Sequence, residues 1–363
     1  MRNGVSSVFL IIILVASGIL SANVWGQSGS DEPKPTNAVE ELVKVFDRFP
    51  LVALGEVHWN QTEHEFVYSL IRHPAFADKV NDIVVEFGNG LYQPIMDRYI
   101  AGETVARTEL RQVWRNTAAA SMATPMTVWD APIYERFFAV VRDVNQTLPK
   151  QKRLRVLLGD PPIDWNAIKS RADMKPVMFD RDGHFVSLIE KEVLGKGRKA
   201  LLFHGAAHLI RRRPAPPPTI EKTPGGVTID VEKRHPGAVF VVMPHQGFGE
   251  RNEELEKRLA SWPKPGLALV KNTWLGDLDP GVAYPPAKMI RLLTPDGGST
   301  SALSLWEGMK FQDMTDAYLY LGPKDSVIID GTIPPEVQRD EEYQRELQRR
   351  RQLRGGQQMR APR

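Results

Sequence analysis

The chain has 363 residues, 42% of them hydrophobic, so it is long and apolar enough to form one large domain or two ordinary ones. Its formal net charge of +3 equals the excess of eight Arg over five acidic residues in segment 336–363, so nothing in the global charge argues for a nucleic-acid partner. Because the chain contains no Cys, a disulfide framework and a Cys nucleophile are both excluded.

Residues 1–26 have the pattern of a secretory signal peptide. One Arg precedes an apolar run from Val8 to about Leu20, and small and polar residues follow before Gln27. An uncleaved anchor is the alternative, but the run is short for a bilayer span. Residues 27–37 are polar and contain Pro, which is typical of a linker. We therefore expect an exported bacterial protein, periplasmic or secreted, with no stable membrane span after cleavage.

Six short apolar runs predict the buried strands of a mostly parallel sheet. None of them alternates with polar residues, as expected of strands covered on both faces. Helix-period segments lie between the runs, and the first of these begins with a predicted capping box of Thr62 and Glu65. This order predicts right-handed crossovers and an α/β fold with helices flanking the sheet. The runs are 51–54, 83–85, 156–158, 200–203, 239–242 and 267–270.

We expect one α/β domain over residues 38–275, with a mostly helical insertion at about 91–150. The Pro-rich stretch 211–226 predicts an exposed loop. Residues 276–335 are expected to extend the same domain less regularly, with a helix and a further strand within 313–330. The charged tail 336–363 is expected to be helical or frayed, with its Arg run facing solvent.

Residues that bind metals or carry protons follow five of the six runs. In a parallel sheet the carboxyl ends of the strands share one edge, and ligands bind in the crevice there. We therefore expect these residues to line one site. They are Glu56, His58, Glu86, Asp160, His204, His208 and His245.

Two of these residues, His58 and His208, each end a G-x-x-H turn that starts at Gly55 or Gly205. Glycine lets the chain leave its strand in an unusual conformation, so the imidazole can point back over the sheet edge. With Glu86 as a third ligand, the pair predicts a divalent metal, Zn or Mn, with an open position for water. The alternative is two structural histidines bonded to the backbone.

Other residues are expected around this centre as substrate-binding groups. His64 lies in the first turn of a helix, where the dipole disfavours the protonated ring. Arg211 opens the Pro-rich loop and is placed to grip an anionic group, although a merely exposed loop arginine is equally compatible. Glu63 and Glu65 are interpreted as helix N-terminal charges only. The full substrate-binding set is His64, Asp160, His204, Arg211 and His245.

Several chemistries are excluded by missing motifs. The chain has no G-x-S-x-G elbow of a serine hydrolase, no G-x-x-x-x-G-K-[ST] phosphate loop and no G-x-G-x-x-G fingerprint. What remains is water activated by a metal or by His and Glu, or a binding site without turnover.

The motifs GEVH (55–58), His64, VVEFGN (84–89) and HGAAH (204–208) resemble the group of ChaN-type haem-binding proteins, erythromycin esterases and Tiki/TraB proteins. The resemblance covers about residues 50–245. It implies a parallel α/β fold with catalytic or ligand-binding roles for Glu56, His58, Glu86 and His208. The chain departs from the lipoprotein form of ChaN, since it has no lipid-bearing Cys, and from the esterases, which carry Gly where it has Trp59.

The sequence therefore predicts an exported hydrolase of the esterase or peptidase class, acting on a small molecule or a peptide. A divalent metal or a His/Glu pair would activate water, with Glu56 or Glu86 as general base. The alternative is a haem- or ligand-binding envelope protein in which the same residues bind without turnover. A scaffold that works through the charged tail is the third hypothesis.

Overall fold

The computed structural model describes residues 30–118, 128–174, 180–212, 226–245, 252–284, 291–293, 299–301 and 308–354. The predicted signal peptide, residues 27–29 of the predicted linker and most of the predicted loop 211–226 lie outside these residues. Within the described part of the chain, every helix is too short or too polar to cross a bilayer.

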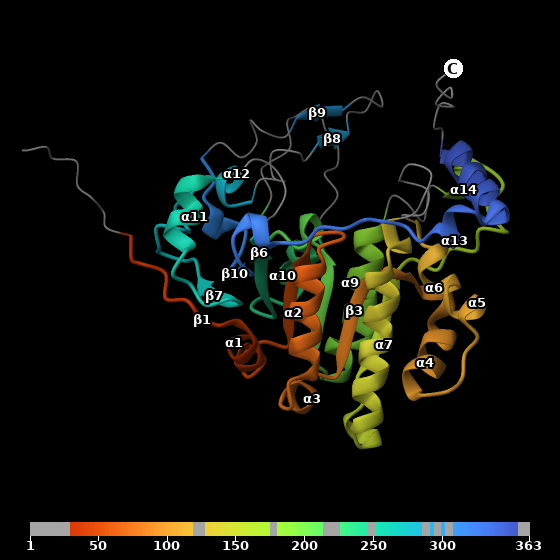
Figure 1. The fold of residues 1–363 in the computed structure, drawn as a ribbon, viewed down its shortest axis with the longest axis horizontal. Coiled ribbons are helices and arrows are strands. Elements are labelled where there is room, and N and C mark those ends of the chain that lie inside the picture. Colours follow the sequence, from red (N-terminus) through yellow and green to blue (C-terminus); the bar gives the residue numbers. More distant parts are fainter. Residues whose placement is uncertain are drawn as a thin grey trace, which may run out of the picture.

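An eight-stranded, mostly parallel sheet with helices on both faces forms the centre of the fold, which confirms the predicted α/β class (Figure 1). Its strand order is β1-β7-β10-β6-β2-β5-β3-β4. The strands are β1 (Thr36–Asn37), β2 (Leu51–Glu56), β3 (Asp82–Asn89), β4 (Arg155–Asp160), β5 (Ala200–Gly205), β6 (Val239–Pro244), β7 (Gly266–Leu269) and β10 (Ala317–Tyr320). A separate pair, β8 (Arg291–Leu293) and β9 (Ser299–Ser301), is antiparallel.

The five strands β6, β2, β5, β3 and β4 run in one direction, as predicted. The run at 267–270 is different, because β7 pairs antiparallel with both β10 and β1. An unbroken apolar run shows that a strand is buried but not which way it points. The further strand expected within 313–330 is β10, which lies between β7 and β6 and is parallel to β6.

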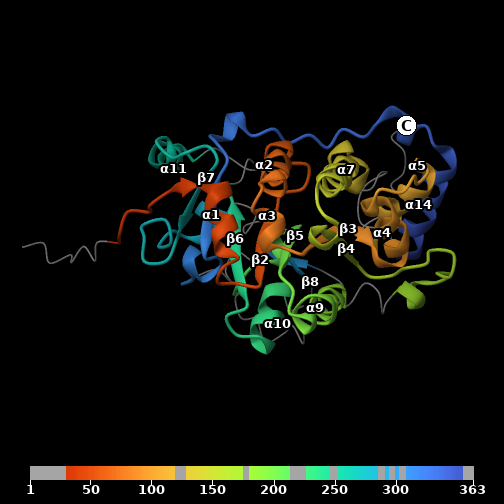
Figure 2. The same ribbon diagram turned by 90° about the horizontal axis from the view of Figure 1, so that it is seen from below.

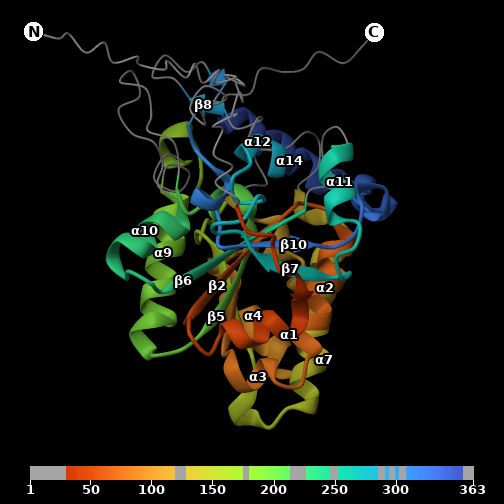
Figure 3. The ribbon, with the colours of Figure 1, turned by 90° about the vertical axis from the view of Figure 1, so that its left-hand side faces the viewer.

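Successive residues of each central strand pack on opposite faces of the sheet, which explains why the runs are apolar throughout. Val52 and Leu54 join the hydrophobic cluster on one face, while Leu51 and Ala53 join the cluster on the other. The first face is covered by α1 (Ala38–Val45), α2 (Gln61–Arg72), α4 (Gln93–Ala101) and α7 (Pro132–Thr147). The second face is covered by α9 (Arg181–Glu192) and α10 (Val227–Arg234), opposite α2 and α7 (Figures 2 and 3). Helix α11 (Glu253–Leu259) adds Leu255 and Leu259 to the second cluster.

Helix α2 begins two residues earlier than its predicted capping box. Asn60 is the N-cap, and its side chain accepts a hydrogen bond from the Glu63 N–H at 3.0 Å. The hydroxyl of Thr62 instead accepts from the Ile328 N–H at 2.9 Å, so the C-terminal part of the chain reaches this helix.

The predicted insertion between β3 and β4 holds α4 to α7, with the short helices α5 (Arg107–Leu110) and α6 (Gln112–Arg115). Short helices α3 (Phe76–Lys79) and α12 (Pro280–Ala283) connect other elements. After β10 the chain crosses the molecule to α13 (Pro335–Gln338) and α14 (Glu341–Arg354), the predicted helical tail (Figure 1).

The expectation that the tail's Arg run faces solvent is wrong for two members. Arg350 is buried, lies 4.7 Å from the Trp165 ring centroid and donates to the carbonyl of Arg115 at 2.8 Å. Arg349 donates to the carbonyls of Trp165 and Ile168. These contacts dock α14 on the insertion and the loop after β4, which the charge pattern of the tail does not reveal.

Candidate active site

The two G-x-x-H turns meet at Gly205, at the carboxyl end of β5. A Cβ atom built on Gly205 would lie 3.2 Å from His58 Cε1, 3.6 Å from His208 Cδ2 and 2.8 Å from Glu86 Oε2. Three of the predicted site residues therefore converge on one point, and no side chain larger than that of glycine fits there. Gly55 is needed for a similar reason, since its Cβ would lie 2.7 Å from the Cβ of Ala206.

Glu56 is buried at the end of β2 and holds His58. Its Oε2 lies 2.8 Å from His58 Nδ1, and its Oε1 accepts a hydrogen bond from the Tyr134 hydroxyl at 2.8 Å. His64 Nε2 lies 3.3 Å from the same Oε1. The Glu56 carboxylate is therefore held by the imidazoles of His58 and His64 and by the hydroxyl of Tyr134.

These contacts determine the protonation states of Glu56 and His58. Burial raises the pKa of Glu56, but the charges and hydrogen bonds of His58 and His64 outweigh it and lower that pKa to about 2. Burial lowers the pKa of His58, and the neighbouring Glu56 more than compensates, raising it to about 9. At neutral pH Glu56 is therefore a carboxylate and His58 a partly exposed imidazolium.

Glu86 lies inside β3, where its two oxygens have different partners. Oε2 accepts the Gly205 N–H at 2.9 Å, and Oε1 lies 3.2 Å from the guanidinium of Arg181. Burial raises the pKa of Glu86, but His204, His208 and Arg181 together lower it below its usual range. Arg181 also binds Asp160 through two donors at 2.7 and 2.9 Å, so Asp160 touches the site only through this arginine.

The second pair of histidines follows β5 and lies on the other side of Glu86. His208 Nδ1 lies 2.6 Å from Asp182 Oδ1, and its Nε2 lies 3.9 Å from Glu86 Oε1. His204 is 2% exposed, and neither of its ring nitrogens makes a hydrogen bond, although Nδ1 lies 3.3 Å from Glu86 Oε2. Burial lowers the pKa of His204 to about 3, which leaves it neutral with a free lone pair.

Among the described residues, two groups of side chains have the spacing of a metal site. They are Glu86 with His204 and His208, and Glu56 with His58 and Glu86, with ligand atoms within 4.8 Å of one another in each. Neither group combines His58 and His208, the two histidines of the predicted trio. Glu86 is the shared member.

The first group fits a cation better than the second. His204 supplies a buried nitrogen without a hydrogen bond, and His208 has its other nitrogen held by a carboxylate, the arrangement in which proteins orient a metal-binding imidazole. In the second group, Glu56 and His58 already form an ion pair with each other.

Several predicted residues lie apart from this centre. His64 is fully buried behind Glu56, 3.4 Å from the Tyr68 hydroxyl, and supports the carboxylate from inside the core. Arg211 donates to Asp316 and to the carbonyl of Val239, at the beginning rather than the end of β6. Neither residue is placed to contact a substrate beside Gly205.

His245, which follows the fifth predicted strand, has hydrogen-bond partners outside this centre. Its two ring nitrogens lie 2.6 Å from the Tyr318 hydroxyl and 3.1 Å from Glu256 Oε1.

The interpretation of Glu63 as a helix charge is wrong, because the side chain is buried and accepts the Val57 N–H at 2.9 Å. Burial raises the pKa of Glu63 well above its usual range.

Three residues of the centre were missed by the sequence analysis. Tyr134 comes from α7, while Arg181 and Asp182 open α9. All three belong to helices, whereas the prediction, apart from His64 and Arg211, relied on residues directly after strands. The one available signal was the Arg-Asp pair at 181–182 ahead of an apolar helical face.

No family model matches the sequence, and no curated protein matches it. Among solved structures, the chain is similar to a mutant erythromycin esterase, EreC, in its open conformation, at 11% identity and TM-score 0.49, over 81% of this chain and 95% of that chain. It is similar to ChaN of Campylobacter jejuni, solved with cofacial haem, at 14% identity and TM-score 0.37, over 58% and 87%. It is also similar to the type III effector HopBA1, at 12% identity and TM-score 0.37, over 62% and 92%.

These likenesses concern the fold. The first two agree with the resemblance that the strand-end motifs predicted.

Proposed function

We propose that the protein is a hydrolase of the esterase or peptidase class whose site is built from Glu56, His58, Glu86, His204 and His208. The observation that carries the proposal is the convergence of His58, Glu86 and His208 on Gly205, next to the unpaired nitrogens of His204. Buried polar atoms without hydrogen bonds are rare in folded proteins and point to a missing partner.

Glu86, His204 and His208 would hold a divalent metal, Zn or Mn. Three protein ligands with an open fourth position are typical of catalytic zinc sites. When bound, such an ion supplies a water molecule with a pKa near neutrality, so the absence of a Ser or Cys nucleophile is no obstacle. Asp182 keeps His208 in the orientation that directs Nε2 toward Glu86.

His58 is the proton donor in this proposal. Its Nδ1 is engaged with Glu56, which leaves Nε2 to give its proton to the leaving oxygen or nitrogen as the scissile bond breaks. Tyr134 and His64 hold Glu56 in place, so the carboxylate keeps His58 charged until the proton is needed. In this proposal Glu56 orients His58 and Glu86 would bind the metal, so neither residue keeps the general-base role that the sequence predicted.

The proposal is tested with the purified full chain by metal analysis together with hydrolysis of a panel of p-nitrophenyl esters and chromogenic peptides. We expect bound Zn or Mn that a His204→Ala or a His208→Ala variant loses, and turnover that a His58→Gln variant lacks. His235→Gln is the matched control, since His235 pairs with Glu190 at a distant surface. Turnover that survives His58→Gln would contradict the assignment of the donor.

Haem carriage is the competing function that the motif resemblance raised. An absorbance scan after haem addition to the same preparation decides it. A Soret band together with absence of metal and of turnover would favour the carrier, whereas metal with turnover and no band would favour the hydrolase.

We also propose that the protein is exported. The apolar N-terminal run supports this, and N-terminal sequencing of the protein from a cell-envelope fraction tests it. A first residue at Gln27 is expected, and an intact Met1 in the cytoplasmic fraction would overturn export.

A further inference from the structure

We propose that Trp59 is a positioning residue through which the C-terminal part of the chain holds His58 at the site. The segment Leu321–Pro334, here called the strap, connects β10 to α13 and crosses over the beginning of α2 (Figures 1 and 2). The inference uses the proposed hydrolase for its catalytic readout, while its structural readout needs no substrate.

Trp59 has an unusual backbone conformation. Its φ is 66°, in the left-handed region that bulky residues rarely adopt and that costs about 1 kcal/mol or more. Such a conformation persists only where surrounding contacts impose it. Because Trp59 follows His58 directly, whatever imposes this φ also sets the direction in which the chain leaves the histidine.

Three hydrogen bonds hold Trp59. Its carbonyl accepts the Asp330 N–H of the strap at 2.9 Å, and its own N–H donates to the Tyr134 hydroxyl at 3.2 Å. The indole Nε1–H donates to the carbonyl of Val128 at 2.8 Å. The backbone and the ring of Trp59 are therefore fixed separately.

Two of these partners lie beside His58. The Tyr134 hydroxyl donates a hydrogen bond to Glu56, the carboxylate that holds His58 Nδ1. Val128 precedes Trp129, whose ring packs edge-on against the His58 ring at 4.8 Å between centroids. A displaced Trp59 would therefore disturb both the charge partner and the packing partner of His58.

Backbone contacts hold the strap against the residues that follow Trp59. Ile329 forms an isolated β-bridge with Asn60, and the Gln61 N–H donates to the carbonyl of Ile328 at 2.8 Å. Gly331 lies against the indole, since a Cβ atom there would be 2.9 Å from Trp59 Cδ2. These contacts join residues about 270 positions apart in the sequence.

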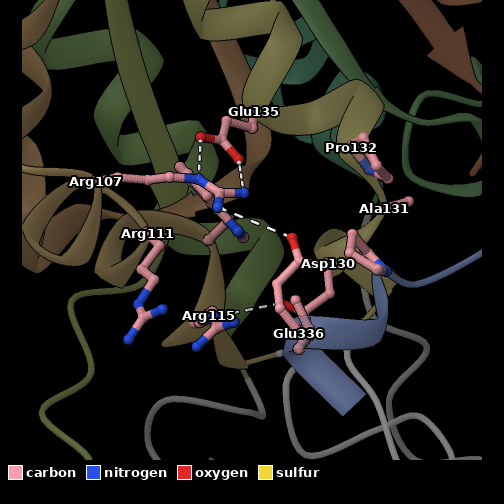
Figure 4. Close-up of a pocket in the computed structure, with 11 residues that line it drawn as sticks. Arg107, Arg111, Arg115, Asp130, Ala131, Pro132, Glu135 and Glu336 are labelled. Carbon is pink, nitrogen blue, oxygen red and sulfur yellow. Dashed lines mark hydrogen bonds and ion pairs between the residues drawn. The ribbon is translucent and has the colours of Figure 1, made fainter. Parts of the chain in front are cut away.

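The far end of the strap, at Pro334, lines a small pocket together with Arg115 and Asp130 (Figure 4). Arg115 of α6 lies 3.0 Å from Asp340 and 3.4 Å from Asp130, and the Tyr343 hydroxyl donates to Asp130 at 3.0 Å. Asp130 follows Trp129, so the C-terminal segment supports both tryptophans next to His58.

Gly331→Ala tests the inference with the smallest change the strap offers. The added methyl group must displace the indole, and we expect kcat for the best ester of the panel to fall about tenfold or more with KM nearly unchanged. The ring signals of His58 in an NMR spectrum at fixed pH should shift as well. Ile328→Ala is the control, because that side chain is 57% exposed on the same strap and should change neither quantity.

The route through Trp59 is tested by a double-mutant cycle. In a Trp59→Gly background, where the left-handed φ carries no strain and the indole is gone, Gly331→Ala should add no further loss. An equal loss in both backgrounds would overturn the inference, as would unchanged His58 signals in Gly331→Ala.

Trp59→Phe provides a second variant in case Gly331→Ala unfolds. It keeps an aromatic ring but lacks the Nε1–H donor to Val128, and it should shift the His58 signals while the melting temperature stays within a few degrees. If no ester or peptide is turned over by the wild type, the proposed function fails while the His58 signals still decide this inference.

Discussion

His204 and His245 are both buried histidines, and replacing each by Leu should change stability in opposite directions. In the metal-free protein, neither ring nitrogen of His204 makes a hydrogen bond, whereas both nitrogens of His245 have partners. A buried polar group without a hydrogen bond costs about 1–3 kcal/mol. His204→Leu removes this penalty but also some packing against Phe185, whose ring centroid lies 3.9 Å away.

We therefore expect His204→Leu to raise the free energy of unfolding by about 1 kcal/mol. His245→Leu should lower it by about 1–3 kcal/mol, because the Tyr318 hydroxyl and the Glu256 carboxylate each lose one buried hydrogen bond. The assay is urea unfolding after dialysis against a chelator, with the midpoint compared at constant m-value. A loss of stability in His204→Leu as large as in His245→Leu would refute the reasoning that His204 keeps a ligand position open.

Three further predictions follow from the ion pairs. Glu56→Gln should lower the pKa of His58 from about 9, because the charge and the hydrogen bond that raise it most are lost while burial still lowers it, and NMR titration measures the change. In the wild type, the stability that this pair contributes is lost as pH rises through about 9 and as pH falls through about 2, so the variant's melting temperature should depend less on pH in both windows. Asp182→Asn should weaken Zn binding about 10–100-fold by removing the carboxylate that orients His208, and a metal titration that finds unchanged affinity would contradict this. Arg181→Met should lower the free energy of unfolding by about 3–5 kcal/mol, since two buried carboxylates lose their cation, and a loss under 1 kcal/mol would contradict it.

The strand-end residues of the centre were predictable because parallel strands bring their carboxyl ends to one edge. Glu56, His204 and Glu86 lie on the adjacent strands β2, β5 and β3, so unbroken apolar runs were enough to place them together. The rule that strand-end residues share one edge also placed His245 in the predicted site. It does not distinguish a residue that faces the cleft from one whose side chain turns into the core. The partners that hold His245, Tyr318 and Glu256, lie 73 and 11 residues away in the chain.

The helix-borne residues were not predictable by that rule. Tyr134, Arg181 and Asp182 reach the centre only because α7 and α9 pack on opposite faces of the sheet, and this packing is a tertiary property. The strap belongs to the same class, since nothing in residues 321–334 indicates that they pair with Asn60 and Gln61. Even the direction of β7 depends on its neighbours, because apolar runs of either direction look alike in the sequence.

The charges at the centre favour a divalent cation over a second protonated histidine. Among the described residues, the carboxyl groups of Glu56, Glu86, Asp160 and Asp182 lie next to the Arg181 guanidinium or to the imidazoles of His58 and His208. The four carboxyl groups outnumber the one permanent cation, Arg181, in a largely buried place, where uncompensated negative charge is costly. Protons cannot remove the excess through His204 near neutral pH, because burial holds its pKa at about 3. A divalent ion bound to Glu86, His204 and His208, as proposed, would compensate it, and we expect such an ion to be released in acid, where protons compete for the histidines.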